Sequence, residues 1–388
     1  MTSTGDSMKP SELQGNILIT GVTGFIGRHV LYEFLNVAME TSWRNKIYIL
    51  LRGKKGLSAA ARVEHLLNHE YLPDYLKKYE YQELADNITA IDGNLEDSDL
   101  GLQLCSLIPR EEQLYVIHNA GSVNLFNTAA AEQEVHHTNW LGTINLIHAI
   151  ELFDSKLVFM STAFSCGIVD GVIGDNFTFY QDNSFRNHYE KCKNLTEKFI
   201  QSYCTEKNIK YQILRPSVVC GRLIDAPLYY ISKFDVFYGW TKFFWNLQNQ
   251  GSTESVRIHI SRNSKVNIVP VDFVAKSVLA FFQQDIPYVN IVYPESINNR
   301  YLHASLLDAL HFNRYEFIDE APTNLNKSEK LYYRSINKVY TPYLNQCSNE
   351  YDTQLIGSIM GSAVMPKIDL HSLANFSICN HFDEEMVY

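Results

Sequence analysis

The chain has 388 residues, of which 46% are hydrophobic and 20% are charged, and its 33 Lys and Arg against 43 Asp and Glu give a net charge of −10 at pH 7. This composition excludes a disordered, collagen-like or coiled-coil protein. The acidic balance argues against a nucleic-acid-binding protein that neutralises phosphates, although a local basic patch could still hold a phosphorylated small molecule. The length allows one large domain or two smaller ones.

The N-terminal residues and the cysteines give no sign of export. The first residues are polar and lack the apolar core of a signal peptide, and no apolar run reaches the ~18 residues that span a bilayer. The seven cysteines include no C-x-x-C pair and are odd in number, as expected for reduced thiols. We therefore expect a soluble, cytoplasmic protein without a transmembrane segment or a metal site.

Short β-rich apolar runs alternate with helical stretches through the first two-thirds of the chain. The predicted strands span residues 16–20, 46–52, 87–92, 114–121, 156–162 and 211–216. The predicted helices include residues 27–38, 58–68, 138–152 and 189–207. Because parallel strands are joined by right-handed crossovers, this pattern predicts an α/β fold with a doubly wound, Rossmann-type parallel sheet.

The alternation breaks after Gly221. Residues 223–262 are rich in aromatic side chains, residues 266–271 restore a strand-like run, and the tail again lacks the pattern. We expect a Rossmann domain over residues 13–222 plus 265–300, and a smaller, mainly helical substrate-binding lobe over residues 223–264 plus 301–388. Ligands of such sheets bind outside the carboxyl ends of the strands, where this lobe would cover them.

A glycine-rich turn joins the first predicted strand to the first predicted helix. Residues 20–27 read TGVTGFIG, with Gly21, Gly24 and Gly27 three residues apart. Glycines at this spacing allow a tight turn, close approach of a pyrophosphate and close packing of helix on strand, and the helix N-terminus favours negative charge. A purely structural turn is the alternative. The position between strand and helix favours dinucleotide binding.

The second predicted strand ends in Arg52, where an NAD-specific domain would place an acidic residue on the ribose 2′-hydroxyl. An arginine suits a 2′-phosphate instead. Arg28, Lys54, Lys55 and Arg62 complete a basic cluster that we place beside the adenosine. A solvated basic loop is the alternative. The sequence therefore favours NADPH (NADP+) over NADH.

Later strands end in small or hydroxyl-bearing residues. The fourth ends in Asn119, Ala120 and Gly121, where a backbone can pass close to a cofactor. The fifth ends in Ser161 and Thr162, at the mouth of the expected cleft.

Tyr189 and Lys193 form a Tyr-x3-Lys pair at the start of the next helix. This spacing puts both side chains on one helix face, so the ammonium can lower the pKa of the phenol. Position selects this pair, because only Tyr189 stands at the start of the helix after the fifth strand. For the other Tyr-x3-Lys pairs we expect core or surface roles: Tyr203/Lys207, Tyr229/Lys233 and Tyr238/Lys242.

Residues 13–300 resemble the extended short-chain dehydrogenase/reductase superfamily, and within it the branch of fatty acyl-CoA reductases, carboxylic acid reductase domains and thioester reductase domains. The matching blocks are TGVTGFIG, LLRGKKG, DGNLEDSDLGL, VIHNAGSVN, TNWLGT, MSTAF, YEKCK, LRPSVVCG and VNIVPVDFVA. The LGL, STAF and VPVDFVA elements favour this branch over sugar-nucleotide epimerases. The chain departs from it at Asn94, where Asp is frequent, and at Cys192, where Ser is common.

The resemblance implies reduction of an acyl thioester, carried by coenzyme A or by an acyl carrier protein, to an aldehyde or further to an alcohol. Tyr189 would donate the proton, and Lys193 would lower its pKa and hold the nicotinamide ribose. Thr162 would donate a hydrogen bond to the substrate carbonyl, with Ser161 as the second choice for this role. The implied cofactor-binding residues are Thr20, Gly21, Thr23, Gly24, Phe25, Ile26, Gly27, Arg28, Arg52, Arg62, Asn94, Leu95, Asn119, Ala120, Gly121, Tyr189, Lys193, Pro216, Ser217 and Val218.

Two other functions stay open. One is a sugar-nucleotide or steroid-type dehydrogenase or epimerase, which would act on a ketone or an alcohol. The other is a non-catalytic NADP-binding sensor, for which a complete set of Thr162, Tyr189 and Lys193 would serve no purpose. The aromatic segment 229–245 and the tail would form the acyl channel, or simply the core of the lobe.

Overall fold

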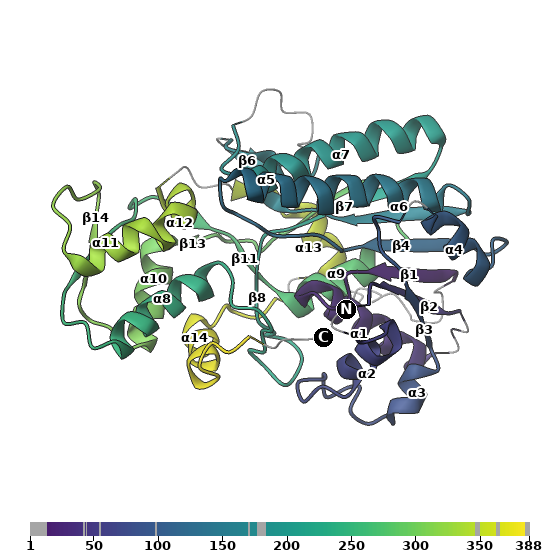
Figure 1. Cartoon of the computed structure of the whole chain (residues 1–388), viewed down its shortest axis with the longest axis horizontal. Coiled ribbons are helices and arrows are strands. Elements are labelled where there is room, and N and C mark those ends of the chain that lie inside the picture. Colours follow the sequence, from purple (N-terminus) through teal and green to yellow (C-terminus); the bar gives the residue numbers. More distant parts are fainter. Residues whose placement is uncertain are drawn as a thin grey trace, which may run out of the picture.

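The computed structural model describes residues 14–384 except residues 42, 44, 54–55, 98, 170, 177–183, 346–349 and 362–364. A seven-stranded sheet, in which all neighbouring strands are parallel, lies at its centre (Figure 1). In spatial order its strands are β12 (Tyr288–Ile291), β7 (Lys210–Pro216), β5 (Ser155–Met160), β4 (Leu114–His118), β1 (Asn16–Thr20), β2 (Ile47–Leu51) and β3 (Ile88–Asp92). The order reverses between β1 and β4, as in a doubly wound sheet.

Helices cover both faces of the sheet (Figure 1). On one face lie α1 (Phe25–Glu40), α2 (Ala59–Leu67) and α9 (Val271–Phe281). On the other lie α4 (Leu100–Leu107), α6 (Gly142–Ile150) and α7 (His188–Lys207). Strands β1, β2, β4 and β5 are buried throughout, which explains why they read as nearly continuous apolar runs. The predicted Rossmann-type α/β fold is confirmed.

The structure differs from the predicted elements in detail. The seventh strand of the sheet is β12, a four-residue strand that was not predicted. The predicted strand 266–271 is divided into β10 (Lys265–Val266) and β11 (Ile268–Pro270), which pair outside the main sheet with β13 (Ile297–Asn298) and β8 (Val218–Cys220). The helix predicted at 138–152 begins as a π-helical turn over His136–Leu141 before α6.

A second group of helices packs beside the sheet around its own hydrophobic core (Figure 1). We call this group the helical lobe. It comprises α8 (Phe237–Asn249), α10 (Asn299–Ala309), α11 (Lys327–Arg334), α12 (Ile336–Asn345) and α14 (Leu370–Cys379), with the paired strands β9 (Val256–His259) and β14 (Tyr315–Ile318). Trp240 and Phe244 of the aromatic-rich segment are fully buried in this core.

The C-terminal tail contributes to both cores. Helix α14 packs against α10 and α8, whereas α13 (Gln354–Met360) packs against α9 and β12 and places Ile356 in the core beside the sheet. Strand β15 (Glu350–Tyr351) pairs with β6 (Val172–Ile173). The division of the chain into two domains stays a prediction.

The remaining helices of the described residues are α3 (Tyr81–Ala85), α5 (Ala129–Val135) and a 3-10 helix over Ala163–Cys166. Within these same residues no helix has both the length and the hydropathy needed to cross a membrane. No group of His, Cys, Asp and Glu side chains in this part of the chain is arranged to hold a metal ion.

Candidate active site

The glycine turn between β1 and α1 is as tight as its sequence predicts. Gly21 has a φ of +74°, and a Cβ on it would lie 2.6 Å from the backbone nitrogen of Ala120. A Cβ on Gly27 would lie 2.2 Å from the carbonyl oxygen of Gly21. Helix α1 begins after Gly24 with no side-chain cap and no acidic residue in its first turn. Its free N–H groups and positive dipole end therefore fit the pyrophosphate of a dinucleotide.

A buried histidine ties the ends of β1 and β4 together. His118 Nδ1 lies 2.8 Å from the Thr20 hydroxyl, and its Nε2 lies 2.9 Å from the hydroxyl of Thr143. Thr143 donates its proton to the carbonyl of Asn139, so it accepts from Nε2–H. Nδ1 then accepts from Thr20, whose oxygen accepts from the backbone N–H of Ala120. Burial lowers the pKa of His118 to about 3, so this chain of bonds runs through a neutral ring.

Two arginines lie where the adenosine of a cofactor is expected. Arg52 follows β2 directly, and Arg62 on α2 donates from Nη1 to the Arg52 carbonyl at 2.6 Å. Both side chains line the same cleft as the glycine turn. Lys54 and Lys55, the other predicted members of this cluster, lie outside the described residues.

Arg28 lies elsewhere. Its side chain is fully buried, donates a hydrogen bond to the hydroxyl of Tyr230, and has its guanidinium 6.0 Å from the Tyr230 ring centroid. Arg28 therefore does not line the cleft with Arg52 and Arg62, because α1 turns this position toward the chain that leads into the lobe. Gly27 also does not line the cleft, because its role is to let α1 pack on the turn.

Tyr189 and Lys193 lie in the first two turns of α7, which is capped by the side chain of Asn187. Lys193 Nζ donates to the Met160 carbonyl at the end of β5 over 2.8 Å, and burial lowers its pKa to about 8. Burial, reinforced by the Glu190 carboxylate, raises the pKa of Tyr189, so the net shift is opposite to the expected lowering by Lys193. The phenol is therefore protonated at neutral pH, as a proton donor must be.

The two hydroxyls after β5 have different partners. Ser161 donates its only proton to the buried carboxylate of Glu197. Thr162 accepts a hydrogen bond from the backbone N–H of Phe164 at 3.3 Å, which leaves its own proton available to a ligand. This arrangement favours Thr162 over Ser161 as a donor to a substrate carbonyl.

Sequence reasoning missed the buried ion pair behind these hydroxyls. Arg215 on β7 donates from Nη2 to Glu197 Oε2 at 2.7 Å and from Nε to both carboxylate oxygens at 3.1 Å. Ser165 donates to the same carboxylate at 2.6 Å. The sequence does contain a signal for this ion pair, because Arg215 stands inside an apolar strand run and Glu197 lies one helical turn beyond Lys193.

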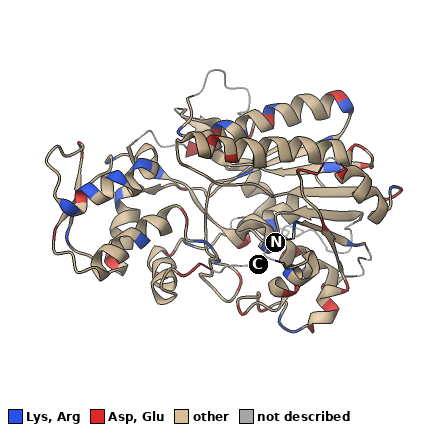
Figure 2. Cartoon of the chain, viewed as in Figure 1, with Lys and Arg blue, Asp and Glu red and all other residues tan. Residues whose placement is uncertain are grey.

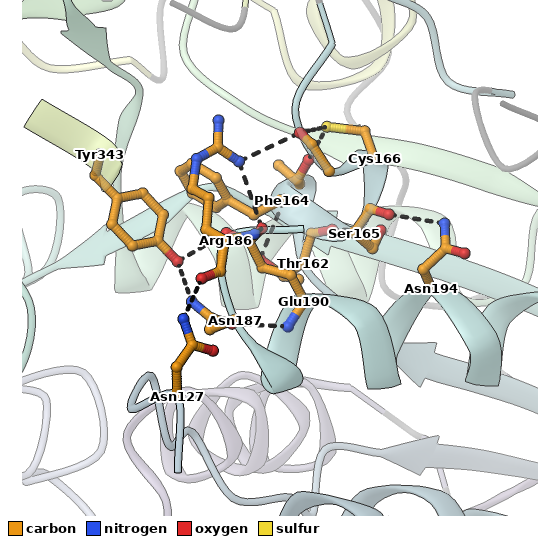
Figure 3. A network of polar contacts seen from close by, with 12 residues as sticks. Asn127, Thr162, Phe164, Ser165, Cys166, Arg186, Asn187, Glu190, Asn194 and Tyr343 are labelled. Carbon is orange, nitrogen blue, oxygen red and sulfur yellow. Dashed lines mark hydrogen bonds and ion pairs between the residues drawn. The ribbon is translucent and has the colours of Figure 1, made fainter. Parts of the chain in front are cut away.

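A second missed network joins the start of α7 to the helical lobe (Figure 3). Tyr343 on α12 donates to Glu190 Oε1 at 2.7 Å and accepts from the Asn187 side chain at 2.7 Å. Arg186 lies 3.4 Å from Glu190 Oε2 and donates to the Gly167 carbonyl. Burial raises the pKa of Glu190, and the Arg186 charge opposes this rise. Sequence reasoning also missed Asn139. Its side chain accepts a hydrogen bond from the Ser122 N–H and donates one to the Ser122 carbonyl.

One cleft of about 1350 Å³ brings the predicted residues together. The predicted residues that line it are Thr20, Gly21, Thr23, Gly24, Phe25, Ile26, Arg52, Arg62, Asn94, Leu95, Asn119, Ala120, Gly121, Ser161, Thr162, Tyr189, Lys193, Pro216, Ser217 and Val218. The lobe adds an apolar wall formed by Ile231, Val236, Phe237, Tyr238, Leu302, Ile336, Val339, Tyr340 and Leu344. The aromatic segment 229–245 thus lines the cleft with its first part, whereas Trp240 and Phe244 belong to the lobe core.

A family model and individual relatives show which known proteins this chain is similar to. The family model described as "Male sterility protein" matches residues 19–278. Fatty acyl-CoA reductase 1 of Mus musculus is 28% identical over 298 residues, which cover 68% of this chain and 54% of the relative. The chain spans about half the length, or less, of the curated relatives considered.

Solved structures share the fold. A thiolation-reductase di-domain from an archaeal non-ribosomal peptide synthetase matches 96% of this chain and 91% of its own, with a TM-score of 0.65 and 21% identity. A dTDP-glucose 4,6-dehydratase from Bacillus anthracis in complex with NAD matches 96% of this chain and 100% of its own, with a TM-score of 0.61 and 14% identity. At these identities the likeness concerns the fold alone.

Proposed function

Because this chain belongs to the family of male sterility proteins, we propose that it is an NADPH-dependent reductase of acyl thioesters. The observation that carries this proposal is that Thr162, Tyr189 and Lys193 line the same cleft as the glycine turn. The mouse relative is named a fatty acyl-CoA reductase, and the archaeal structure joins a reductase to a thiolation domain. Both names support a thioester as the substrate.

The glycine turn and the first turn of α1 would hold the pyrophosphate, and Arg52 with Arg62 would hold the 2′-phosphate. When bound, the nicotinamide would supply the hydride that the carbonyl carbon receives. The hydroxyls of Thr162 and Tyr189 donate to the carbonyl oxygen, where negative charge develops. Tyr189 then gives its proton to that oxygen, and the nearby Lys193 ammonium stabilises the phenolate that remains.

The resulting thiohemiacetal breaks down at the same residues. The Tyr189 phenolate takes back the hydroxyl proton as the C–S bond breaks, which releases an aldehyde and a thiolate that solvent protonates. A second hydride transfer to the aldehyde at this site would give an alcohol. The apolar wall from residues 231–238 and 336–344 would hold the acyl chain.

The proposal is tested by NADPH oxidation across a panel of acyl-CoA esters of different lengths, with product analysis. We expect aldehyde or alcohol from the wild-type chain and a loss of kcat of about 10²–10⁴-fold in Tyr189→Phe, because general acid catalysis contributes roughly this much. NADPH affinity should stay unchanged in this variant.

Tyr203→Phe is the matched control, because Tyr203 also precedes a lysine by four residues on α7 but binds Glu151 at the surface. It should keep full activity. Reduction by NADH as fast as by NADPH would refute the assignment of Arg52. No reduction of any acyl-CoA or carrier-bound thioester, with tight NADPH binding, would refute the reductase and favour a dehydrogenase or a sensor.

A further inference from the structure

A histidine stands in the apolar wall that the helical lobe presents to the cleft. His303 on α10 lines the cleft and is only 4% exposed. Leu302, Phe237 and Leu344 line the cleft as well, and all three are buried. A wall that holds a plain hydrocarbon chain gains nothing from an imidazole, because a buried polar group without a hydrogen bond costs free energy. The histidine therefore points to a more specific role.

The ring of His303 is held in one orientation. Its Nδ1 lies 2.7 Å from the carbonyl oxygen of Asn299, one turn earlier on α10. The ring also packs edge to face on Trp240, with the ring centroids 4.4 Å apart and the planes at 81°. A carbonyl oxygen can only accept a hydrogen bond, so Nδ1 carries the proton. In the neutral ring Nε2 is then an acceptor.

The Nε2 atom of His303 has no hydrogen-bond donor among the described residues. Burial lowers the pKa of His303 to about 4, so the ring is neutral near pH 7 and Nε2 keeps its lone pair. Because Nδ1 is turned back onto its own helix, the far edge of the ring, which carries Nε2, is left to face the cleft. The cleft thus holds a fixed acceptor that a bound molecule can satisfy.

A chain of contacts relates His303 to the proposed proton donor. Asn299, which holds the ring through its carbonyl, donates from Nδ2 to the backbone carbonyl of Tyr343 at 3.2 Å. The hydroxyl of Tyr343 in turn binds Glu190, the residue after Tyr189 (Figure 3). His303 therefore lies on the lobe side of the cleft, beyond Tyr343 as seen from Tyr189, where an acyl chain attached to the reacting carbonyl would run.

The charges on the lobe side of the cleft favour one kind of hydrogen-bond donor. Figure 2 shows the Lys and Arg residues of α11 and α12 as a blue row along these helices. Among the described residues, the lobe and the segment that leads into it contribute Lys233, Arg334 and Lys338 to the cleft. Their one carboxylate in the cleft, Asp235, pairs with Lys233 at 2.6 Å. This excess of positive charge disfavours an ammonium group on the substrate. A neutral hydroxyl can donate to Nε2 without this repulsion.

On the basis of the proposed function, we propose that Nε2 of His303 binds a hydroxyl group on the acyl chain, so that the substrates are thioesters of hydroxy acids. The thioester lies at Thr162 and Tyr189, the chain runs along the apolar wall, and its hydroxyl donates a hydrogen bond to the imidazole. An unsubstituted chain leaves Nε2 without a donor, and sites built around such a bond reject ligands that lack it. His303 thus determines specificity and takes no part in the hydride or proton transfer.

The test compares saturated acyl-CoA esters with their monohydroxy derivatives of the same length, in which the hydroxyl is moved along the chain. For at least one position of the hydroxyl we expect kcat/KM to exceed that of the unsubstituted ester by about three- to tenfold, as one hydrogen bond of this kind allows. His303→Phe keeps an aromatic ring beside Trp240 but has no acceptor. In this variant the ratio should fall to about one, with NADPH affinity unchanged.

Two further variants serve as controls. His303→Gln is the conservative variant, because the glutamine oxygen can accept in place of Nε2, and it should keep part of the preference. His259→Phe is the matched control, because His259 on β9 belongs to the lobe but does not line the cleft. It should keep the full preference. Calorimetry of the full chain with dodecanoic acid and its monohydroxy derivatives, in the presence of NADP+, needs no turnover and should show the same order of affinities.

The outcomes separate this inference from the proposed function. Equal kcat/KM for the unsubstituted ester and every hydroxy ester, or a preference that His303→Phe retains, would overturn the hydroxyl site while the reductase stands, and would assign Nε2 to a bound water. A stronger preference for an amide than for a hydroxyl at the same position would also overturn it. If no thioester is reduced, the proposed function fails, and the calorimetry alone decides whether His303 binds a hydroxyl.

Discussion

Ser161 and Thr162 are neighbours with the same functional group, yet their surroundings give them different roles. The Ser161 proton is held by the Glu197 carboxylate, which is fully buried and also bound by Arg215. The Thr162 hydroxyl is partnered only through its acceptor side, by the N–H of Phe164. A hydroxyl has one proton to donate, so only Thr162 is free to polarise a carbonyl in the cleft.

Alanine substitution at these two positions should therefore have different effects. Thr162→Ala should lower kcat by about 10²-fold or more, as expected for a lost oxyanion donor, with little change in stability. Ser161→Ala should lower the free energy of unfolding by about 1–3 kcal/mol, because a buried carboxylate loses a donor. Steady-state kinetics and urea denaturation measure the two effects. The reverse pattern would assign the carbonyl to Ser161.

At the level of elements, the site depends on how closely α1 approaches β1 and β4. The backbone at Gly21 and Gly27 leaves no room for a side chain, and the chain of bonds through His118 fixes the ends of the two strands. The N-terminus of α1 is thereby held at the carboxyl edge of the sheet, at the reversal of strand order where such folds bind their ligands.

Gly27→Ala should push α1 away from this turn. Because the new Cβ would meet the Gly21 carbonyl, we expect a loss of about 1–3 kcal/mol in stability, together with a large loss of NADPH affinity. Gly357→Ala is the control: this glycine also lies in a helix, α13, and a Cβ there meets no atom within 4 Å. That variant should be neutral or slightly stabilising. Thermal unfolding and NADPH titration distinguish the two, and unchanged NADPH affinity in Gly27→Ala would contradict the assigned cofactor site.

For the molecule as a whole, the cleft exists because the sheet and the helical lobe are held side by side. Asp272, at the start of α9, is buried and accepts hydrogen bonds from the backbone N–H groups of Leu223, Ile224 and Asp225 over 2.6–3.1 Å. These residues lead from the sheet into the lobe. Tyr343 and Glu190 form a second link across the cleft (Figure 3).

Asp272→Ala should leave several backbone donors without their acceptor. We expect a loss of about 3 kcal/mol or more in the free energy of unfolding, since each bond to a charged group is worth about 1.5–3 kcal/mol. Asp272→Asn keeps an acceptor oxygen and should lose less. Urea denaturation checks both, and near-equal stability of Asp272→Ala and the wild-type chain would show that this link does not hold the lobe.

Local patterns in the sequence were sufficient for much of the fold and for a proposal of the site residues. The strand–helix alternation predicted the sheet up to β7, because buried parallel strands are short apolar runs and the glycine turn marks the first crossover. Position within that pattern also selected Tyr189 among the Tyr-x3-Lys pairs, and the structure places it in the cleft with Lys193 and Thr162.

Only the tertiary structure decided which polar groups meet. Arg28 is paired with Tyr230, a residue 202 positions away, and does not line the cleft with Arg52 and Arg62. Glu197 accepts the hydrogen bond of Ser161 and not that of Thr162, and burial raises the pKa of Tyr189. The physical reason is the distance along the chain over which each effect acts. Periodicity and turn chemistry involve residues a few positions apart, whereas polar pairing and desolvation depend on which distant segments pack together.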